Sequence, residues 1–231
     1  MLKIKTISIA LFATFFAFSA MAEMISMGLT GSALYYDASG HEKMKSSGNK
    51  TNKSESGAAG FVSIFIEGTL PNTDTIVGLD VIPYSSKIGD GSNSVPDTDV
   101  EDDADTAGTN KVDVLMSNAV MLYIEQPVDI PGLSNFGDSF IKLGYSQMTL
   151  ETDETVQTGS TYGDESMDGI HVGVGMRGDM DSGGFWKAGL LYTSYDGATF
   201  KGSSDVDSVN NTIELEDMDT LSLRISVGQS F

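Results

Sequence analysis

The chain of 231 residues has no cysteine, only 5 prolines and a single tryptophan. Without cysteine it forms no disulfide and no thiolate metal site, so its stability has to come from other interactions. Basic residues are also scarce: 13 Lys and Arg stand against 33 Asp and Glu, a net charge of −20. This balance excludes nucleic acid as an expected partner, because binding phosphate backbones requires a basic face.

Long hydrophobic runs are absent after the first 22 residues. No later segment reaches 18 consecutive apolar residues, so no membrane-spanning helix is expected. A closed β-barrel stays compatible with this sequence, since it also pairs every backbone group and gives a weaker signal per segment.

The first 22 residues have the layout of a secretory signal peptide. Lys3 and Lys5 precede a 12-residue apolar run at residues 7–18, and Ala20-Met21-Ala22 forms a small-x-small cleavage site. The run is shorter than the roughly 20 residues that a transmembrane helix needs. We expect residues 1–22 to be cleaved and residues 23–231 to form one domain.

Glycine is abundant and the apolar residues alternate with a period of two, which predicts β-strands. Eight strands are expected, at residues 24–37, 58–70, 75–85, 112–126, 139–151, 168–178, 184–196 and 220–231.

The expected connections alternate in length. Those after the second, fourth and sixth strands have about 4, 12 and 5 residues, and the other four have about 16 to 26. Short turns on one side and long loops on the other are typical of a transmembrane barrel, with the turns in the periplasm.

Aromatic residues gather near the expected strand ends, as in the girdles at the two membrane interfaces. They are Tyr35, Tyr36, Tyr84, Phe140, Phe185, Trp186, Tyr192, Tyr195 and Phe231.

The two faces of the expected strands differ in charge. One parity is apolar and is assigned to lipid, for example Leu221, Leu223, Ile225 and Val227, or Val77, Leu79 and Val81. The other parity carries the charges and is assigned to the lumen, where it forms a predicted charge network of Glu67, Asp80, Glu125, Lys142, His171, Arg177, Lys187 and Arg224.

Two interpretations of this network compete. Paired charges can fill and close a narrow lumen, or they can line a small gated pore or proton path. An eight-stranded barrel is only just wide enough for side chains to fill it, which favours the plug.

An acidic segment lies in the expected loop between the third and fourth strands. Its carboxylates are Asp97, Asp99, Glu101, Asp102, Asp103 and Asp105. The EF-hand pattern is not met, because Asp102 and Gly108 stand where glycine and glutamate are required. We expect loosely bound calcium or magnesium as counter-ions and no cofactor.

The segment 41–56 is the one basic outer loop, with Lys43, Lys45, Lys50 and Lys53. It is expected to be a flexible polar loop, with contact to anionic lipopolysaccharide as the alternative. No enzyme is expected, because the chain has two histidines and neither a G-x-S-x-G nor an H-E-x-x-H motif.

Taken together, the leader, the eight strands, the alternating connections and the terminal aromatic residue resemble the small outer-membrane β-barrels, the group with the OmpA transmembrane domain, OmpX and OmpW. The resemblance implies that Leu223, Ile225, Val227 and Phe231 form the C-terminal signal for the barrel-assembly machinery. Gln229 departs from that pattern.

The sequence therefore predicts an all-β, eight-stranded antiparallel up-and-down transmembrane barrel in a Gram-negative outer membrane. We expect a monomer that contacts membrane lipid and lipopolysaccharide and has a structural or surface-interaction role through its acidic loops. A narrow channel for small or apolar solutes and a secreted soluble β-sandwich adhesin remain as alternatives.

Overall fold

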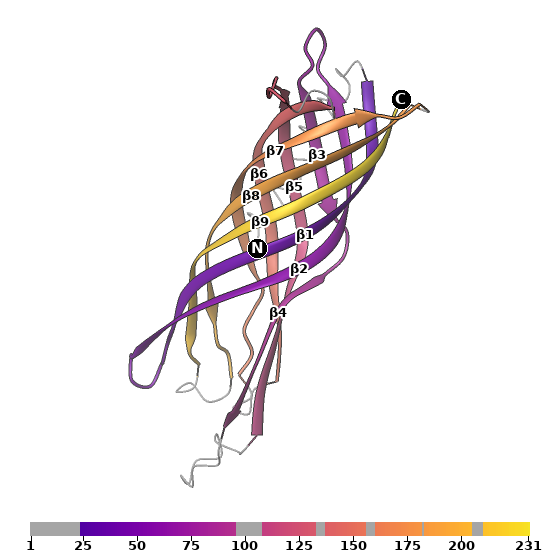
Figure 1. Ribbon diagram of the computed structural model, residues 1–231. Coiled ribbons are helices and arrows are strands. Elements are labelled where there is room, and N and C mark those ends of the chain that lie inside the picture. Colours follow the sequence, from indigo (N-terminus) through magenta and orange to yellow (C-terminus); the bar gives the residue numbers. More distant parts are fainter. Residues whose placement is uncertain (1–23, 96–107, 133–136, 156–159, 182, 205–209) are drawn as a thin grey trace.

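The strands of the protein form a single ring, seen in a computed structural model that describes residues 24–95, 108–132, 137–155, 160–181, 183–204 and 210–231 (Figure 1). The strands are β1 (Met24–Lys43), β2 (Lys50–Thr69), β3 (Ile76–Ile82), β4 (Ser86–Val95), β5 (Gly108–Pro127), β6 (Asp138–Thr155), β7 (Glu165–Asp179), β8 (Gly184–Lys201) and β9 (Thr212–Ser230). No helix in this part of the chain is long and apolar enough to cross a membrane. The predicted signal peptide lies outside the described residues.

The nine strands fill eight positions around the ring, because β3 and β4 are consecutive halves of one barrel strand. Both pair with β5, β3 against residues 119–125 and β4 against residues 108–116. Every pairing is antiparallel, β3 joins β2 to β5, and β1 pairs with β9. The predicted eight-stranded antiparallel barrel is therefore confirmed. The soluble sandwich is wrong, since the strands form one closed ring and not two stacked sheets.

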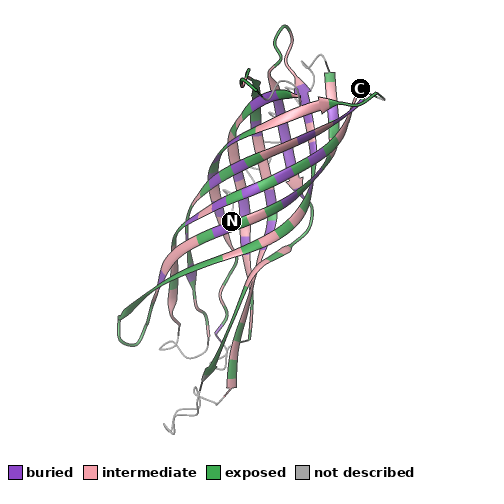
Figure 2. Cartoon of the chain, in the orientation of Figure 1, coloured by how far each residue is buried: buried purple, intermediate pink, exposed green. Residues whose placement is uncertain are grey.

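Buried and exposed residues alternate along the strands over the middle of the barrel, as the period of two predicted (Figure 2). On β9 the side chains of Leu221, Leu223, Ile225 and Val227 are all exposed, while Ser222, Arg224 and Ser226 between them are buried. Val77 and Leu79 share the outward parity of β3 and were assigned to lipid, but both are buried.

Several aromatic residues do not lie in the girdles to which they were assigned. Tyr35, Tyr84, Tyr192 and Phe231 are exposed, in keeping with an interface. Tyr36, Phe140 and Phe185 are buried inside the ring instead. Strand parity explains the difference, because Phe140 shares a face with Lys142, and Phe185 shares a face with Lys187.

The strands are longer than expected on the side of the long connections. β1 and β2 continue to Lys43 and Lys50, so the segment predicted as a flexible loop at residues 41–56 is mostly a β-hairpin (Figure 1). Polar side chains suit this region because both faces of a strand beyond the membrane meet water. The β4–β5 hairpin projects in the same direction, and its hydrogen bonds from Lys87 to Asp113 and Asp90 raise the pKa of Lys87.

The outer connections are tied to one another by hydrogen bonds. Asn211 accepts from the backbone of Lys45 and donates to Glu42, which joins the connection after β8 to the β1–β2 hairpin. Thr161 and Ser203 form a backbone bridge with N···O distances of 2.9 and 2.8 Å. Three of the four outer connections thus form one continuous rim.

The pairing of β1 with β9 forms the seam that closes the ring, and a substitution there tests the closure directly. A Cβ atom on Gly28 would lie 2.1 Å from the carbonyl oxygen of Val227 and 2.6 Å from the Phe65 ring. We predict that Gly28→Ala lowers the free energy of unfolding by about 1–3 kcal/mol through overpacking. The matched control is Gly31→Ala on the same strand, where the nearest atom is 4.0 Å away. Thermal unfolding in detergent is the measurement, and equal midpoints for the two variants would contradict the close approach at the seam.

Candidate functional site

The candidate site is the lumen, where three layers of side chains lie between the periplasmic mouth and the outer rim. The first two layers are polar and hold the residues of the predicted charge network. The third is apolar. Each layer is built by the inward parity of several strands, so residues far apart in the sequence meet across the ring.

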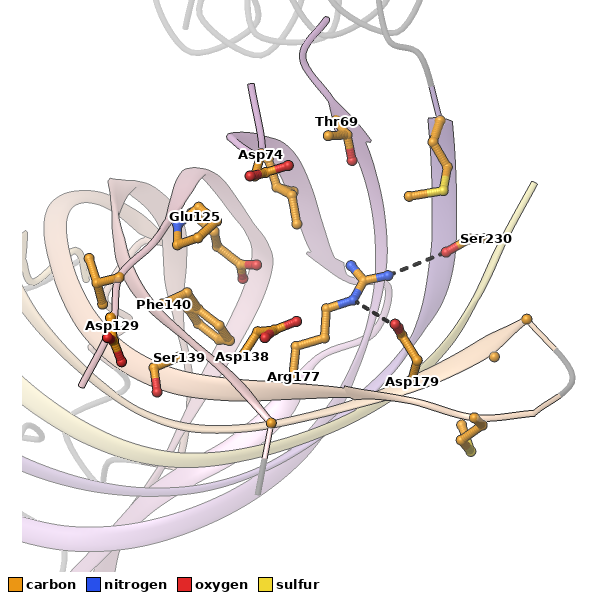
Figure 3. A pocket seen from close by; sticks show the side chains of 18 residues that line it. Thr69, Asp74, Glu125, Asp129, Asp138, Ser139, Phe140, Arg177, Asp179 and Ser230 are labelled. Carbon is orange, nitrogen blue, oxygen red and sulfur yellow. Dashed lines mark hydrogen bonds and ion pairs between the residues drawn. The ribbon is translucent and has the colours of Figure 1, made fainter. Parts of the chain in front are cut away.

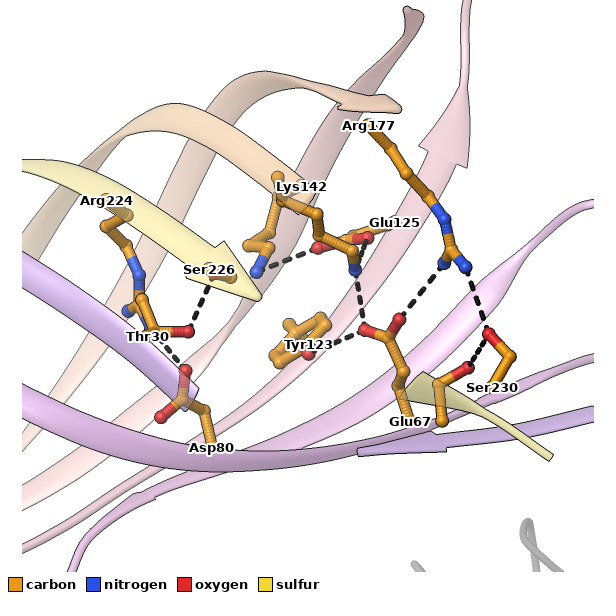
Figure 4. Close-up of polar contacts among 12 residues, drawn as sticks. Thr30, Glu67, Asp80, Tyr123, Glu125, Lys142, Arg177, Arg224, Ser226 and Ser230 are labelled. Carbon is orange, nitrogen blue, oxygen red and sulfur yellow. Dashed lines mark hydrogen bonds and ion pairs between the residues drawn. The ribbon is translucent and has the colours of Figure 1, made fainter. Parts of the chain in front are cut away.

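The first layer centres on Lys187 of β8. Figure 4 labels four of its other charged members, Glu67, Glu125, Lys142 and Arg177. The Nζ atom of Lys187 lies 2.6 Å from a carboxylate oxygen of Glu67 on β2 and 2.6 Å from one of Glu125 on β5. Lys142 lies 2.8 Å from the second oxygen of Glu125, and Arg177 lies 3.2 Å from the second oxygen of Glu67. Five charged side chains from five strands therefore form one chain of ion pairs.

Aromatic rings enclose this layer. Lys142 Nζ lies 3.6 Å from the centre of the Tyr123 ring, and the Arg177 guanidinium lies 3.8 Å from that of Phe185. The hydroxyl of Tyr123 also donates to Glu67 at 3.1 Å. Such rings favour a cation over their faces and exclude water from its surroundings.

The second layer pairs Arg224 of β9 with Asp80 of β3. The guanidinium donates to the Asp80 carboxylate and contacts Ser63 Oγ at 3.5 Å. Nearby, Ser146 and His171 share a hydrogen bond of 2.9 Å. His171 lies across from Gly144, where a Cβ atom would be 2.4 Å from Nε2.

The structure brings together seven of the eight side chains of the predicted network as ion pairs, and His171 lies beside them without a charged partner. Glu67, Asp80 and Glu125 supply three negative charges, against four positive charges from Lys142, Arg177, Lys187 and Arg224. A fourth carboxylate, Asp179, lies at the mouth with its oxygen 3.7 Å from Arg177 Nε. Its side chain is 82% exposed, so it offsets the extra positive charge at the mouth and not among the buried side chains.

Sequence reasoning missed the third, apolar layer. Ten buried residues form it in the outer half of the ring: Tyr36, Ile82, Met116, Ala119, Met148, Leu150, Met167, Ala198, Phe200 and Met218. The signal was present in the four methionines on inward parities. It was overlooked because Phe200 and Met218 lie outside the expected strands and Met167 lies just before one.

The periplasmic mouth is open (Figure 3). A cavity of about 900 Å³ lies there, and Arg177, Glu125 and Phe140 are among the residues that line it. The guanidinium of Arg177 reaches Ser230 Oγ at 3.3 Å and so connects β7 to the end of β9. Farther into the lumen, two small cavities of about 40 and 30 Å³ are lined in part by Arg224.

The described residues form neither a catalytic triad nor a metal-binding group. Ser146 and His171 resemble a nucleophile–base pair, but both are buried and Nε2 of His171 has no hydrogen-bond partner. A triad needs an orienting acid at that nitrogen. No group of three His, Cys, Asp or Glu side chains that could hold a metal ion occurs in this part of the chain. The six acidic residues predicted to attract calcium or magnesium lie outside it.

Comparisons with known proteins agree with the architecture. No family model and no curated protein matches the chain. Among solved structures, the outer-membrane protein AlkL matches with a TM-score of 0.57 and 12% identity over 90% of both chains. OprG from Pseudomonas aeruginosa matches with a TM-score of 0.54 and 14% identity over 91% of this chain and 97% of its own. The protein has the fold of the small bacterial outer-membrane β-barrels.

The second layer gives a test of how far the ion pairs stabilise the ring. We predict that Arg224→Met lowers the free energy of unfolding by about 3–5 kcal/mol, because it leaves Asp80 buried without a counter-charge. The double variant Arg224→Met/Asp80→Leu should recover most of this loss. Lys111→Met, at an exposed position of β5, is the control. Thermal unfolding in detergent decides, and a double variant as unstable as Arg224→Met would show that packing and not charge is responsible.

Proposed function

We propose that this protein is a Gram-negative outer-membrane barrel with a closed lumen and a structural or surface-interaction role. The single observation that carries the proposal is the chain of ion pairs from Arg177 through Glu67, Lys187 and Glu125 to Lys142. An eight-stranded ring holds little more than its own side chains, and these five reach across it.

The apolar layer supports the same function from the outer side. Its ten side chains are buried against one another, so an ion that passed the first layer would meet a dry interior. Moving an unpaired ion into such surroundings is costly. The charged first layer and the apolar third layer thus both oppose the passage of water-soluble cations and anions.

The outer-membrane location also determines the roles that we propose for residues outside the lumen. We propose that Leu223, Ile225 and Val227, exposed on β9, and Phe231, exposed directly after it, serve as the recognition signal for barrel assembly. We propose no catalytic role, since Ser146 and His171 are enclosed and lack an acid partner. The protein is proposed to act as a monomer whose acidic outer segments attract divalent cations loosely.

The proposal is tested by conductance. The folded protein, identified by its faster gel mobility before heating, is inserted in planar lipid bilayers beside a porin of known conductance. We expect no channel steps from the wild type under conditions in which the porin opens. Regular ion-conducting steps at neutral pH would overturn the closed lumen, and absence of the heat-dependent mobility shift would overturn the barrel.

A second function, passage of small apolar solutes, is favoured by one observation. The outer half of the lumen is lined by Met116, Met148, Met167 and Met218, whose flexible thioether side chains adapt to different apolar shapes. We predict that Met148→Lys, at a position that is 1% exposed, abolishes any protein-dependent entry of an apolar fluorescent probe into liposomes. Equal entry with wild type, with Met148→Lys and with protein-free liposomes would exclude this function and leave the closed barrel.

A further inference from the structure

A row of basic side chains crosses four neighbouring strands at the outer edge of the barrel. Lys50 of β2 lies directly opposite Lys43 of β1, Lys43 lies opposite Thr212 of β9, and Thr212 lies opposite Lys201 of β8. Directly opposed residues present their side chains on the same face of a sheet. The outer lysine row therefore consists of Lys50, Lys43, Thr212 and Lys201 on one face.

The row spans the sheet where the β1–β2 hairpin adjoins the ends of β8 and β9 (Figure 1). Neighbouring strands are about 4.8 Å apart, so the three lysines extend over about 14 Å. All three are exposed. The hydroxyl of Thr212 lies in the middle of the row and can also donate a hydrogen bond.

The charge of the row is not compensated by an ion pair among the described residues. No described carboxylate forms an ion pair with Lys43, Lys50 or Lys201, although the chain as a whole carries a net charge of −20. Like charges placed directly opposite each other, such as Lys43 and Lys50, destabilise a strand pair. The three cations thus lie together with no ion-pair partner in the part of the chain that the structure describes.

Three described acids on the adjoining positions of β1 and β9 have partners other than the lysines of the row. One row closer to the membrane, His41 contacts Glu214 and Glu216 at 3.1 Å each. Glu42 accepts a hydrogen bond of 2.8 Å from Asn211. None of these three carboxylates forms an ion pair with Lys43, Lys50 or Lys201, so the row is available to an external anion.

The height of the row indicates where that anion lies. Tyr35, exposed at the outer interface, precedes Lys43 by eight residues on β1. At about 3.3 Å per residue and a tilt near 40°, the row stands roughly 20 Å beyond the interface. At that height it meets the saccharide of the outer leaflet and not the acyl chains.

We propose that the outer lysine row binds the phosphate groups carried on the core saccharide of lipopolysaccharide. The proposal rests on the outer-membrane location inferred above, which directs this edge of the barrel outward. Three ammonium groups spaced along about 14 Å suit several separate phosphates on an extended glycan better than one small ion. The interaction ties the β1–β2 hairpin to the ends of β8 and β9 through a shared ligand.

The test uses the full barrel in phosphatidylcholine nanodiscs and isothermal titration with deacylated lipopolysaccharide core oligosaccharide. Lys43→Gln/Lys201→Gln removes two charges from the row. Lys53→Gln/Lys111→Gln removes two exposed lysines that lie outside it. We expect the first double variant to bind the phosphorylated glycan about tenfold or more weakly than wild type, and the second to stay within about twofold.

Two further ligands complete the experiment. The same oligosaccharide after removal of its phosphates should not bind, and inorganic phosphate should bind far more weakly than the glycan. Equal weakening by both double variants would show a non-specific charge effect and overturn the proposal. Unchanged binding of the dephosphorylated glycan, tight binding of inorganic phosphate alone, or no binding by wild type would also overturn it. Heat-dependent gel mobility of every variant reports separately on the barrel.

Discussion

An eight-stranded ring encloses so little space that every charge inside it must find its partner among the side chains of the opposite wall. Lys187 meets this requirement for two strands at once, because its ammonium group lies between Glu67 and Glu125. Lys142 and Arg177 continue the chain of ion pairs from these three, and Arg224 and Asp80 form a separate pair. Removing water from the lumen, balancing its charge and holding the strands in register are therefore consequences of one set of contacts.

The sequence was sufficient to predict the ring because each strand carries its own pattern. Alternation on β9 predicted that Leu223 faces lipid and Arg224 faces the lumen, and the structure places them so. The same parity argument placed the charged residues inside without any knowledge of their partners. It could not give the pairs, since whether Lys142 meets Glu125 or Glu67 depends on stagger between strands that only the closed ring defines.

The predictions were wrong where they used a residue's position along its strand and ignored which face of the strand its side chain is on. Phe140 and Phe185 lie at strand ends, which suggested a girdle, yet both share the face of a lumen lysine and are buried. The apolar layer was missed for a related reason. Strands that continue beyond the membrane carry polar residues on their outer face, so their alternation no longer separates lipid from lumen, and Met218 was left outside the expected strand.

The break between β3 and β4 shows how the wall changes at the membrane surface. Pro83 has no N–H to donate, and pairing between β2 and β3 reaches only to Ile64 and Val81. The next free backbone donor on β2, the N–H of Val62, is taken by the hydroxyl of Tyr84 at 2.6 Å. Beyond this point the described part of β4 pairs with β5 alone. The hydroxyl of Tyr84 thus replaces a ladder hydrogen bond where β4 separates from β2, so that no unpaired donor of Val62 is exposed to lipid. On the other side, β5 stays paired with β6 as far as Lys111.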